Sequence, residues 1–232
     1  MKNIPAKPYF YTKISSLVYV VMEEQNHGVV FESRIILAHT GVTKDEYQSK
    51  LKSAYTASMD IQKGILSDKN YSVKACKEAK KIYCGDALRF YAHCRDDDFT
   101  IIMGAWKQTS KTMKTFYQII EVDISKDKFS ELWSDVQESA LENFVNYVKS
   151  IPSGKQGQLD NKSKWKKLRD ELYKDNQGLI RIDAKIDSKS QRRVQCSIGV
   201  SDLLKNFEHR VYSSDYKGIR LPYEQASGSR QF

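Results

Sequence analysis

Hydrophobic positions recur at every second residue in several short stretches of the chain, a period typical of β-strands. Near the N-terminus, 15–22 is mostly apolar, and in 29–38 apolar residues alternate with polar ones. The residues between them, 25–28, are turn formers that include Asn and Gly. We therefore expect strands over 15–22 and 29–38, joined as an antiparallel hairpin.

A helical pattern follows this hairpin. Thr43 and Glu46 have the spacing of a capping box, in which each side chain bonds to the other residue's backbone N–H. Apolar residues then recur at helical spacing, so we expect a helix over 44–66. A weaker repeat over 72–83, with lysines on its polar sides, indicates a second helix.

The middle of the chain predicts strands and then a long helix. Alternating patterns over 87–95, 99–106 and 115–124 predict a three-strand meander. A broad apolar stripe over 126–149, preceded by Ser125 as N-cap, predicts a helix wide enough to cover a sheet face.

Polar and small residues over 152–163 interrupt these patterns and indicate a linker. Beyond it, an apolar stripe predicts a short helix over 163–174. Alternation over 180–186 and 194–200 predicts a hairpin with one dry face and one charged face.

These elements predict an α+β fold. Its first domain, 1–151, would be a mainly antiparallel sheet, made of a hairpin and a three-strand meander and covered by two long helices. The linker 152–163 would then lead to a smaller basic helix–hairpin module over 164–232.

Composition fits an ordinary globular protein. The chain has 232 residues, of which 40% are hydrophobic and 29% charged, so it can bury a sizeable core. Its apolar runs are shorter than the roughly 18 residues that cross a membrane, and the N-terminus has no apolar signal region. We expect a cytoplasmic protein without a membrane partner.

The four cysteines are Cys76, Cys84, Cys94 and Cys196. They form no C-x-x-C pair, and no histidine lies at the usual zinc spacing from them. We expect reduced thiols, with Cys94 and Cys196 in cores and no disulfide-linked partner.

Charge is distributed unevenly and gives the clearest functional signal. Residues 1–150 carry 21 Lys and Arg against 19 Asp and Glu, whereas 151–232 carry 17 against 10. The C-terminal part thus holds +7 of the net charge of +9. Such asymmetry favours an electrostatic partner, most often a nucleic acid.

Cations on one rigid surface can displace the counterions that surround phosphates. We therefore expect a non-catalytic nucleic-acid-binding protein, for DNA or RNA, without a cofactor. An exposed Trp165 would stack a base, although its apolar stripe with Leu168 and Leu172 favours packing into a core. The expected binding residues are Lys162, Lys164, Lys166, Lys167, Arg169, Lys189, Arg192 and Arg193.

Two alternatives stay open. Asp183 and Lys185, two apart on one strand face, resemble the arrangement in PD-(D/E)xK nucleases, with Asp175 as the nearest second carboxylate. That resemblance implies a Mg²⁺-dependent nuclease. The 14 tyrosines equally suit a protein–protein adaptor or inhibitor with a protein partner.

The remaining motifs give weaker evidence for a metal-binding or catalytic site. The acidic run 96–98 could bind a divalent cation, but a hairpin tip rich in Asp is normally a solvated turn. The four histidines are scattered, and we find neither a nucleophile elbow nor a phosphate-binding glycine loop.

Overall fold

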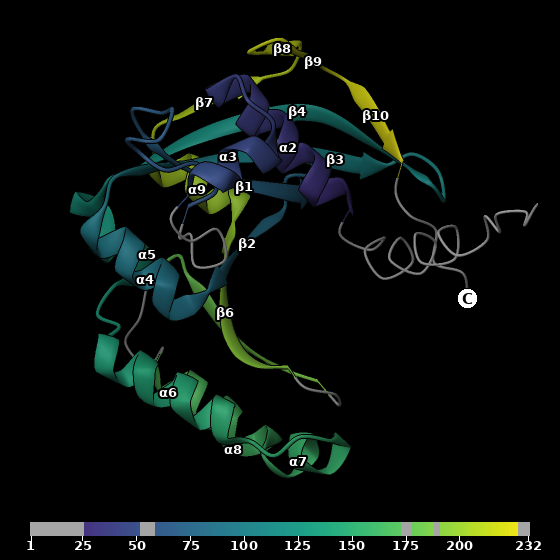
Figure 1. The fold of residues 1–232 in the computed structure, drawn as a ribbon. Coiled ribbons are helices and arrows are strands. Elements are labelled where there is room, and N and C mark those ends of the chain that lie inside the picture. Colours follow the sequence, from purple (N-terminus) through teal and green to yellow (C-terminus); the bar gives the residue numbers. More distant parts are fainter. Residues whose placement is uncertain (1–25, 52–58, 173–177, 188–190, 227–232) are drawn as a thin grey trace, which may run out of the picture.

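The computed structural model describes residues 26–51, 59–172, 178–187 and 191–226. Across these residues the protein is a mixed α+β fold whose strands form three sheets (Figure 1). The strand expected over 15–22 lies outside the described residues, as do the candidate residues Asp175 and Lys189.

The larger sheet is centred on β3 (Phe99–Gln108) and β4 (Met113–Ile124), which pair antiparallel. β1 (Asn70–Lys77) runs parallel to β3. β7 (His209–Tyr212) and β10 (Tyr223–Ala226) pair antiparallel with different parts of β4. The strands predicted over 99–106 and 115–124 are thus confirmed.

A second sheet has the order β2–β6–β5, and all its pairs are antiparallel. Its strands are β2 (Lys81–Asp86), β6 (Arg192–Gly199) and β5 (Arg181–Ile186). β5 and β6 confirm the predicted C-terminal hairpin. In Figure 1 the hairpin curves away from the larger sheet towards the lower helices. A short hairpin is formed by β8 (Asp215–Tyr216) and β9 (Ile219–Arg220).

Helices cover both faces of the larger sheet. α2 (Asn26–Thr40) and α3 (Lys44–Lys50) share one hydrophobic cluster with it. On its other face, a second cluster joins it to the second sheet and to three helices: α4 (Ala87–Asp96), α5 (Phe129–Trp133) and α6 (Glu138–Ser150). The larger sheet is therefore buried on both sides.

The remaining helices are short or lie near the β5–β6 hairpin. A 3₁₀ turn, η2 (Lys126–Lys128), leads into α5. α7 (Lys155–Asp160) and α8 (Lys162–Leu172) follow α6, and α9 (Val200–Asn206) follows β6. α8 confirms the helix predicted over 163–174.

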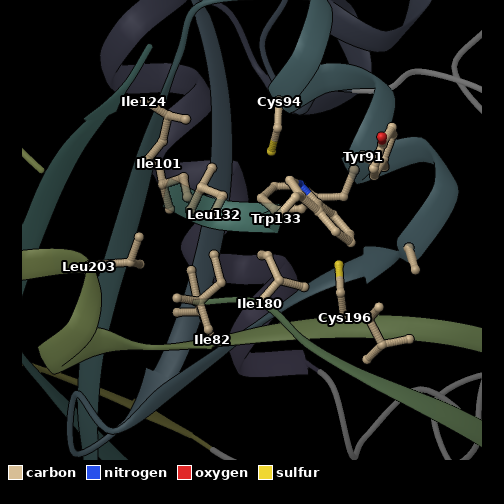
Figure 2. Packing of buried hydrophobic residues seen from close by; sticks show 14 of the residues in the cluster. Ile82, Tyr91, Cys94, Ile101, Ile124, Leu132, Trp133, Ile180, Cys196 and Leu203 are labelled. Atoms are coloured by element: carbon tan, nitrogen blue, oxygen red, sulfur yellow. The ribbon is translucent and has the colours of Figure 1, made fainter. Parts of the chain in front are cut away.

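Trp133 is at the centre of the cluster between the two sheets and is fully buried. Its ring meets that of Tyr91 edge-on, with centroids 5.0 Å apart. Figure 2 shows the sulfur atoms of Cys94, from α4, and Cys196, from β6, pointing towards this ring. Both cysteines are buried, as predicted, and all four cysteines are free thiols.

The cluster on the other face depends on close approach between a helix and the sheet. Phe31 of α2 stacks on Phe116 of β4, with ring centroids 5.1 Å apart. A Cβ at Gly104 of β3 would lie 2.6 Å from the Phe31 ring. Only glycine leaves room for Phe31 at this point of the sheet.

The strand expected over 29–38 is wrong, because this segment belongs to helix α2. Its buried residues Ile35 and Ile36 lie about one helical turn after the buried Phe31, a spacing that the alternating interpretation overlooked. The larger sheet offers this apolar stripe a surface to cover.

The helix expected over 72–83 is also wrong. β1 and β2 occupy it, and a tight turn joins them, closed by a 3.1 Å hydrogen bond from Lys80 N to Lys77 O. Glu78 and Ala79 both adopt positive φ, 51° and 50°. Since such turns usually contain Gly or Asn, this sequence gave no turn signal.

The first strand of the expected meander, 87–95, is helix α4 instead. Asp86 caps it by accepting a 3.0 Å hydrogen bond from Arg89 N. Ala87, Phe90 and Cys94 are buried at helical spacing. The run 96–98 therefore begins at the last residue of this helix and is not a hairpin tip.

Both long helices are shorter than expected. The capping box of Thr43 and Glu46 is confirmed, but α3 ends at Lys50, and Ile61 forms a β-bridge with Tyr71. The helix expected over 126–149 is divided into η2, α5 and α6. Ser134, with φ of 51°, ends α5, although Ser125 caps the segment as predicted.

The chain on either side of 152–163 contributes to the same sheets. β6 pairs with β2, and β7 and β10 pair with β4. Part of 152–163 is itself helical, as α7. The boundary expected there does not separate two sets of strands.

Candidate nucleic-acid interface

The outer face of the β5–β6 hairpin carries charge because of the strict alternation in both strands. Ile182 and Cys196 are register partners that point into the core. The residues between them along each strand must point outward. On β5 the outward residues are Arg181, Asp183 and Lys185, and on β6 they are Arg193, Gln195 and Ser197, of which Ser197 is buried.

Lys185 and Arg193 lie directly opposite each other on this outer face. Both are exposed, and neither forms an ion pair with a described carboxylate. Like charges directly opposite each other on a sheet are destabilising. An anion bound between the two side chains would remove this repulsion.

α8 runs beside β5 and extends the positive charge. Arg169 Nη1 lies 3.5 Å from Asp183 Oδ1, and Gln158 Nε2 of α7 donates to Ile186 O over 2.7 Å. Lys166 lies between these two contact points in the sequence, and Lys162 is one turn before it. Both lysines are exposed.

We define the cationic face as Lys162 and Lys166 of α8, Arg181 and Lys185 of β5, and Arg193 of β6. None of these five has an ion pair to another described residue. Asp183, the carboxylate among them, is paired with Arg169. The cationic face therefore keeps most of its positive charge available to a ligand.

The other predicted residues of α8 have more local roles. Lys164 Nζ lies 4.9 Å from the centre of the Tyr147 ring, and Lys167 is exposed on the solvent side. Arg169 stacks over Trp165 and pairs with Asp170. Trp165 is half-buried against the main cluster, which favours a packing role.

Arg192, predicted to contact phosphate, is engaged within the protein. Its guanidinium donates to the carbonyl oxygens of Ile151 at 3.0 Å, Pro152 at 2.7 Å and Asp187 at 2.8 Å. Ile151 is the C-cap of α6, where a cation also stabilises the helix dipole. Arg192 thus ties the hairpin to α6, while its neighbour Arg193 faces solvent.

The nuclease alternative needs two carboxylates near Lys185. Asp183 has Arg169 as its ion-pair partner, and Asp175 lies outside the described residues. Across the described parts of the chain, no group of three His, Cys, Asp or Glu residues could hold a metal ion.

The acidic run 96–98 is engaged in local bonds. Asp96 forms an ion pair with Arg95, and Asp97 lies 3.5 Å from His93. Asp98 accepts a 2.9 Å hydrogen bond from Lys126 N. The Asp98 contact fastens the segment after α4 to the start of η2, and the other two are local to the end of α4.

β2 adds two residues to this surface that the sequence did not indicate. Tyr83 is the register partner of Ser197, which in turn pairs with Arg181. Tyr83 is 57% exposed, and Lys81 Nζ lies 5.9 Å from the centre of its ring. Since 72–83 was expected to be a helix, nothing placed Tyr83 beside the hairpin.

A buried polar network lies at the other side of the larger sheet. Glu121 accepts hydrogen bonds from Tyr216 Oη at 2.6 Å, Arg210 Nε at 2.9 Å and Tyr212 Oη at 3.1 Å. Burial raises the pKa of Glu121, but these three hydrogen bonds outweigh it and lower the pKa overall. His39 Nε2 lies 2.6 Å from Tyr216 Oη.

This network links α2, β4, β7 and β8, and its hydrogen bonds hold these four elements together. Since Tyr216 donates its one hydroxyl proton to Glu121, His39 must be the donor to the Tyr216 oxygen. Glu121 was missed as a buried residue because its strand face, opposite Ile120 and Val122, was expected to meet solvent.

Among the described residues, no helix is long and apolar enough to span a membrane. The chain matches no protein-family model, and neither a curated protein nor a solved structure shows significant similarity to it.

Proposed function

We propose that this protein binds nucleic acid through the cationic face, without catalysing a reaction on it. The observation that carries the proposal is the pairing of Lys185 with Arg193 on the exposed face of a rigid hairpin. Repulsion between the two favours an anionic ligand, and phosphate groups in a row supply one.

Rigidity supports the proposal as well. The dry side of the hairpin packs Ile182, Val194 and Cys196 into the main core, and Arg192, next to the turn, ties that end of the hairpin to α6. The cations therefore project from a fixed scaffold, and ligand binding does not have to order the backbone that carries them.

The test is fluorescence anisotropy with labelled 20-mers of RNA and DNA over a series of salt concentrations, with and without Mg²⁺. We expect binding that weakens linearly in log K against log[salt], and intact oligonucleotides in both conditions. If neither RNA nor DNA shows saturable binding at low salt, the proposal is contradicted and a protein partner is favoured. Mg²⁺-dependent cleavage that Asp183→Asn abolishes would instead establish the nuclease alternative.

A charge variant locates the interface. Lys185→Gln combined with Arg193→Gln should weaken binding to all sequences alike, because phosphate contacts carry no sequence information. Lys63→Gln combined with Lys126→Gln is the matched control, since both lysines are exposed and lie outside the cationic face. Equal losses in the two double variants would place the binding surface elsewhere.

A further inference from the structure

Tyr83 is an exposed aromatic side chain on the outer sheet face, with cations on both sides. It is 57% exposed, although β2 is in register with the buried strand β6 beside it. Across the sheet, Tyr83, Ser197 and Arg181 occupy one row. Ser197 between them is only 1% exposed, so the sheet surface between the phenol ring and Arg181 is covered, whereas the Tyr83 ring itself is exposed.

The same face continues from this row to Lys185 and Arg193. Lys185 is four residues beyond Arg181 on β5, and Arg193 is four residues before Ser197 on β6. At about 3.3 Å per strand residue the two rows are roughly 13 Å apart. That distance is about four nucleotides at a rise of 3.4 Å for each, and fewer in an extended strand.

A lone exposed aromatic residue is common on protein surfaces and explains nothing by itself. Here the ring shares a sheet face with Lys185 and Arg193, which have no ion pair to a described residue, and with Lys81 at its other side. Arg181 adds a third cation, although its Nη1 also donates to Gly178 O over 3.0 Å. This combination of a stacking surface with a track of phosphate-binding cations is what sequence-tolerant binding of single strands requires.

Resting on the proposed function, we propose that the ligand is single-stranded nucleic acid and that an unpaired base stacks on Tyr83 while the strand's phosphates follow Arg181, Lys185 and Arg193. A duplex keeps its bases stacked on one another, so they present their edges and not their faces to Tyr83. Duplexes would use the cations alone and bind more weakly.

The experiment compares 20-nucleotide poly(dT), poly(rU) and a 20-base-pair DNA duplex by anisotropy at fixed low salt. The variants are Tyr83→Leu, which keeps an apolar side chain without a ring, and Tyr83→Phe, which keeps the ring. Leu159→Ala on α7 is the control, because Leu159 is also exposed, at 52%, but lies off the sheet face.

We expect Tyr83→Leu to weaken single-strand binding about five- to 150-fold, the usual range for loss of one stacked base, and to leave duplex binding unchanged. Tyr83→Phe and Leu159→Ala should bind like the wild type. The poly(dT) and poly(rU) arms show whether the 2′-hydroxyl adds affinity. Thermal unfolding of each variant checks that the fold is retained.

Two results would overturn the inference. Duplex binding as tight as single-strand binding, or a Tyr83→Leu variant with wild-type affinity for both single strands, would remove Tyr83 from the site while leaving the cationic face intact. Absence of binding to all three probes would instead reject the proposed function itself.

Discussion

Tyr216 Oη donates a 2.6 Å hydrogen bond to Glu121, 95 residues away in the sequence. It joins the β8–β9 hairpin to the central strand β4, and His39 of α2 completes the chain of bonds. Removal of one partner from such a buried network leaves the others unsatisfied.

Tyr216→Phe should therefore lower the free energy of unfolding by about 1–3 kcal/mol in urea denaturation. Tyr223→Phe is the matched control, because the Tyr223 hydroxyl is buried without a hydrogen-bond partner among the described residues. Its removal should be neutral or slightly stabilising. Equal effects of the two changes would mean that the Glu121 network contributes nothing to stability.

Acid should destabilise the protein before its carboxylates titrate. Burial, with a smaller effect of Lys217, lowers the pKa of His39 to about 4, and burial and Lys114 do the same for His27. The folded state thus excludes protons that the unfolded chain takes up near pH 6.5. The stability due to these histidines is complete above pH 6.5 and is lost towards pH 4.

Each such proton gives a slope of about 1.4 kcal/mol per pH unit. Between pH 5 and 6 the two histidines together contribute at most about twice this value, reduced by solvent screening of the partly exposed rings. Glu32, whose pKa burial raises, acts in the opposite direction. His39→Gln should lower the slope by up to about one such proton. Glu121 and Asp68 oppose the shift of His39, and Tyr71 packs against its ring. An unchanged slope in His39→Gln, measured by urea denaturation at each pH, would show that His39 titrates normally in the folded state.

Trp133→Ala should cost about 3–5 kcal/mol, as expected for a fully buried large side chain. The ring fills the space between α4 and the two sheets, and neighbours from several elements cannot all move to close the cavity. A loss below roughly 1 kcal/mol in chemical denaturation would contradict this packing.

Arg192 and Arg193 are adjacent in sequence but should behave in opposite ways. Arg192→Gln should lower stability by about 1.5–3 kcal/mol, because it removes charged hydrogen bonds to the end of α6, and leave binding of the folded protein nearly unchanged. Arg193→Gln should change stability by less than about 0.5 kcal/mol and weaken binding. Denaturation and anisotropy on the same two variants check both statements.

Sequence patterns were most informative where one hydrophobic period fitted a segment and no second period did. The β5–β6 hairpin, β3 and β4 follow their alternation because a single period fits each of them. In α2 and α4, both a strand and a helical period fit the apolar residues, and tertiary packing decided between them. The Asp86 cap was the local signal for α4 that could have resolved it.

The candidate site was predicted in part for the same reason. Lys162, Lys166 and Arg193 were predicted as binding residues because clusters of basic residues are visible in the sequence itself. Arg192 looked identical to Arg193, and its role depends on the carbonyl groups of Ile151 and Pro152, 40 or more residues away. Tyr83 became part of the surface only through pairing of β2 with β6, a long-range contact.

The most direct test of the account is the slope of log K against log[salt] for a single-stranded 20-mer, in the wild type and in the Lys185→Gln, Arg193→Gln double variant. Each phosphate contact contributes about 0.7 to this slope on single strands. With two contacts removed, we expect the magnitude of the slope to fall by about 1.4 in the double variant and to stay unchanged in the Lys63→Gln, Lys126→Gln control. A wild-type slope in the double variant would contradict the assignment of the cationic face.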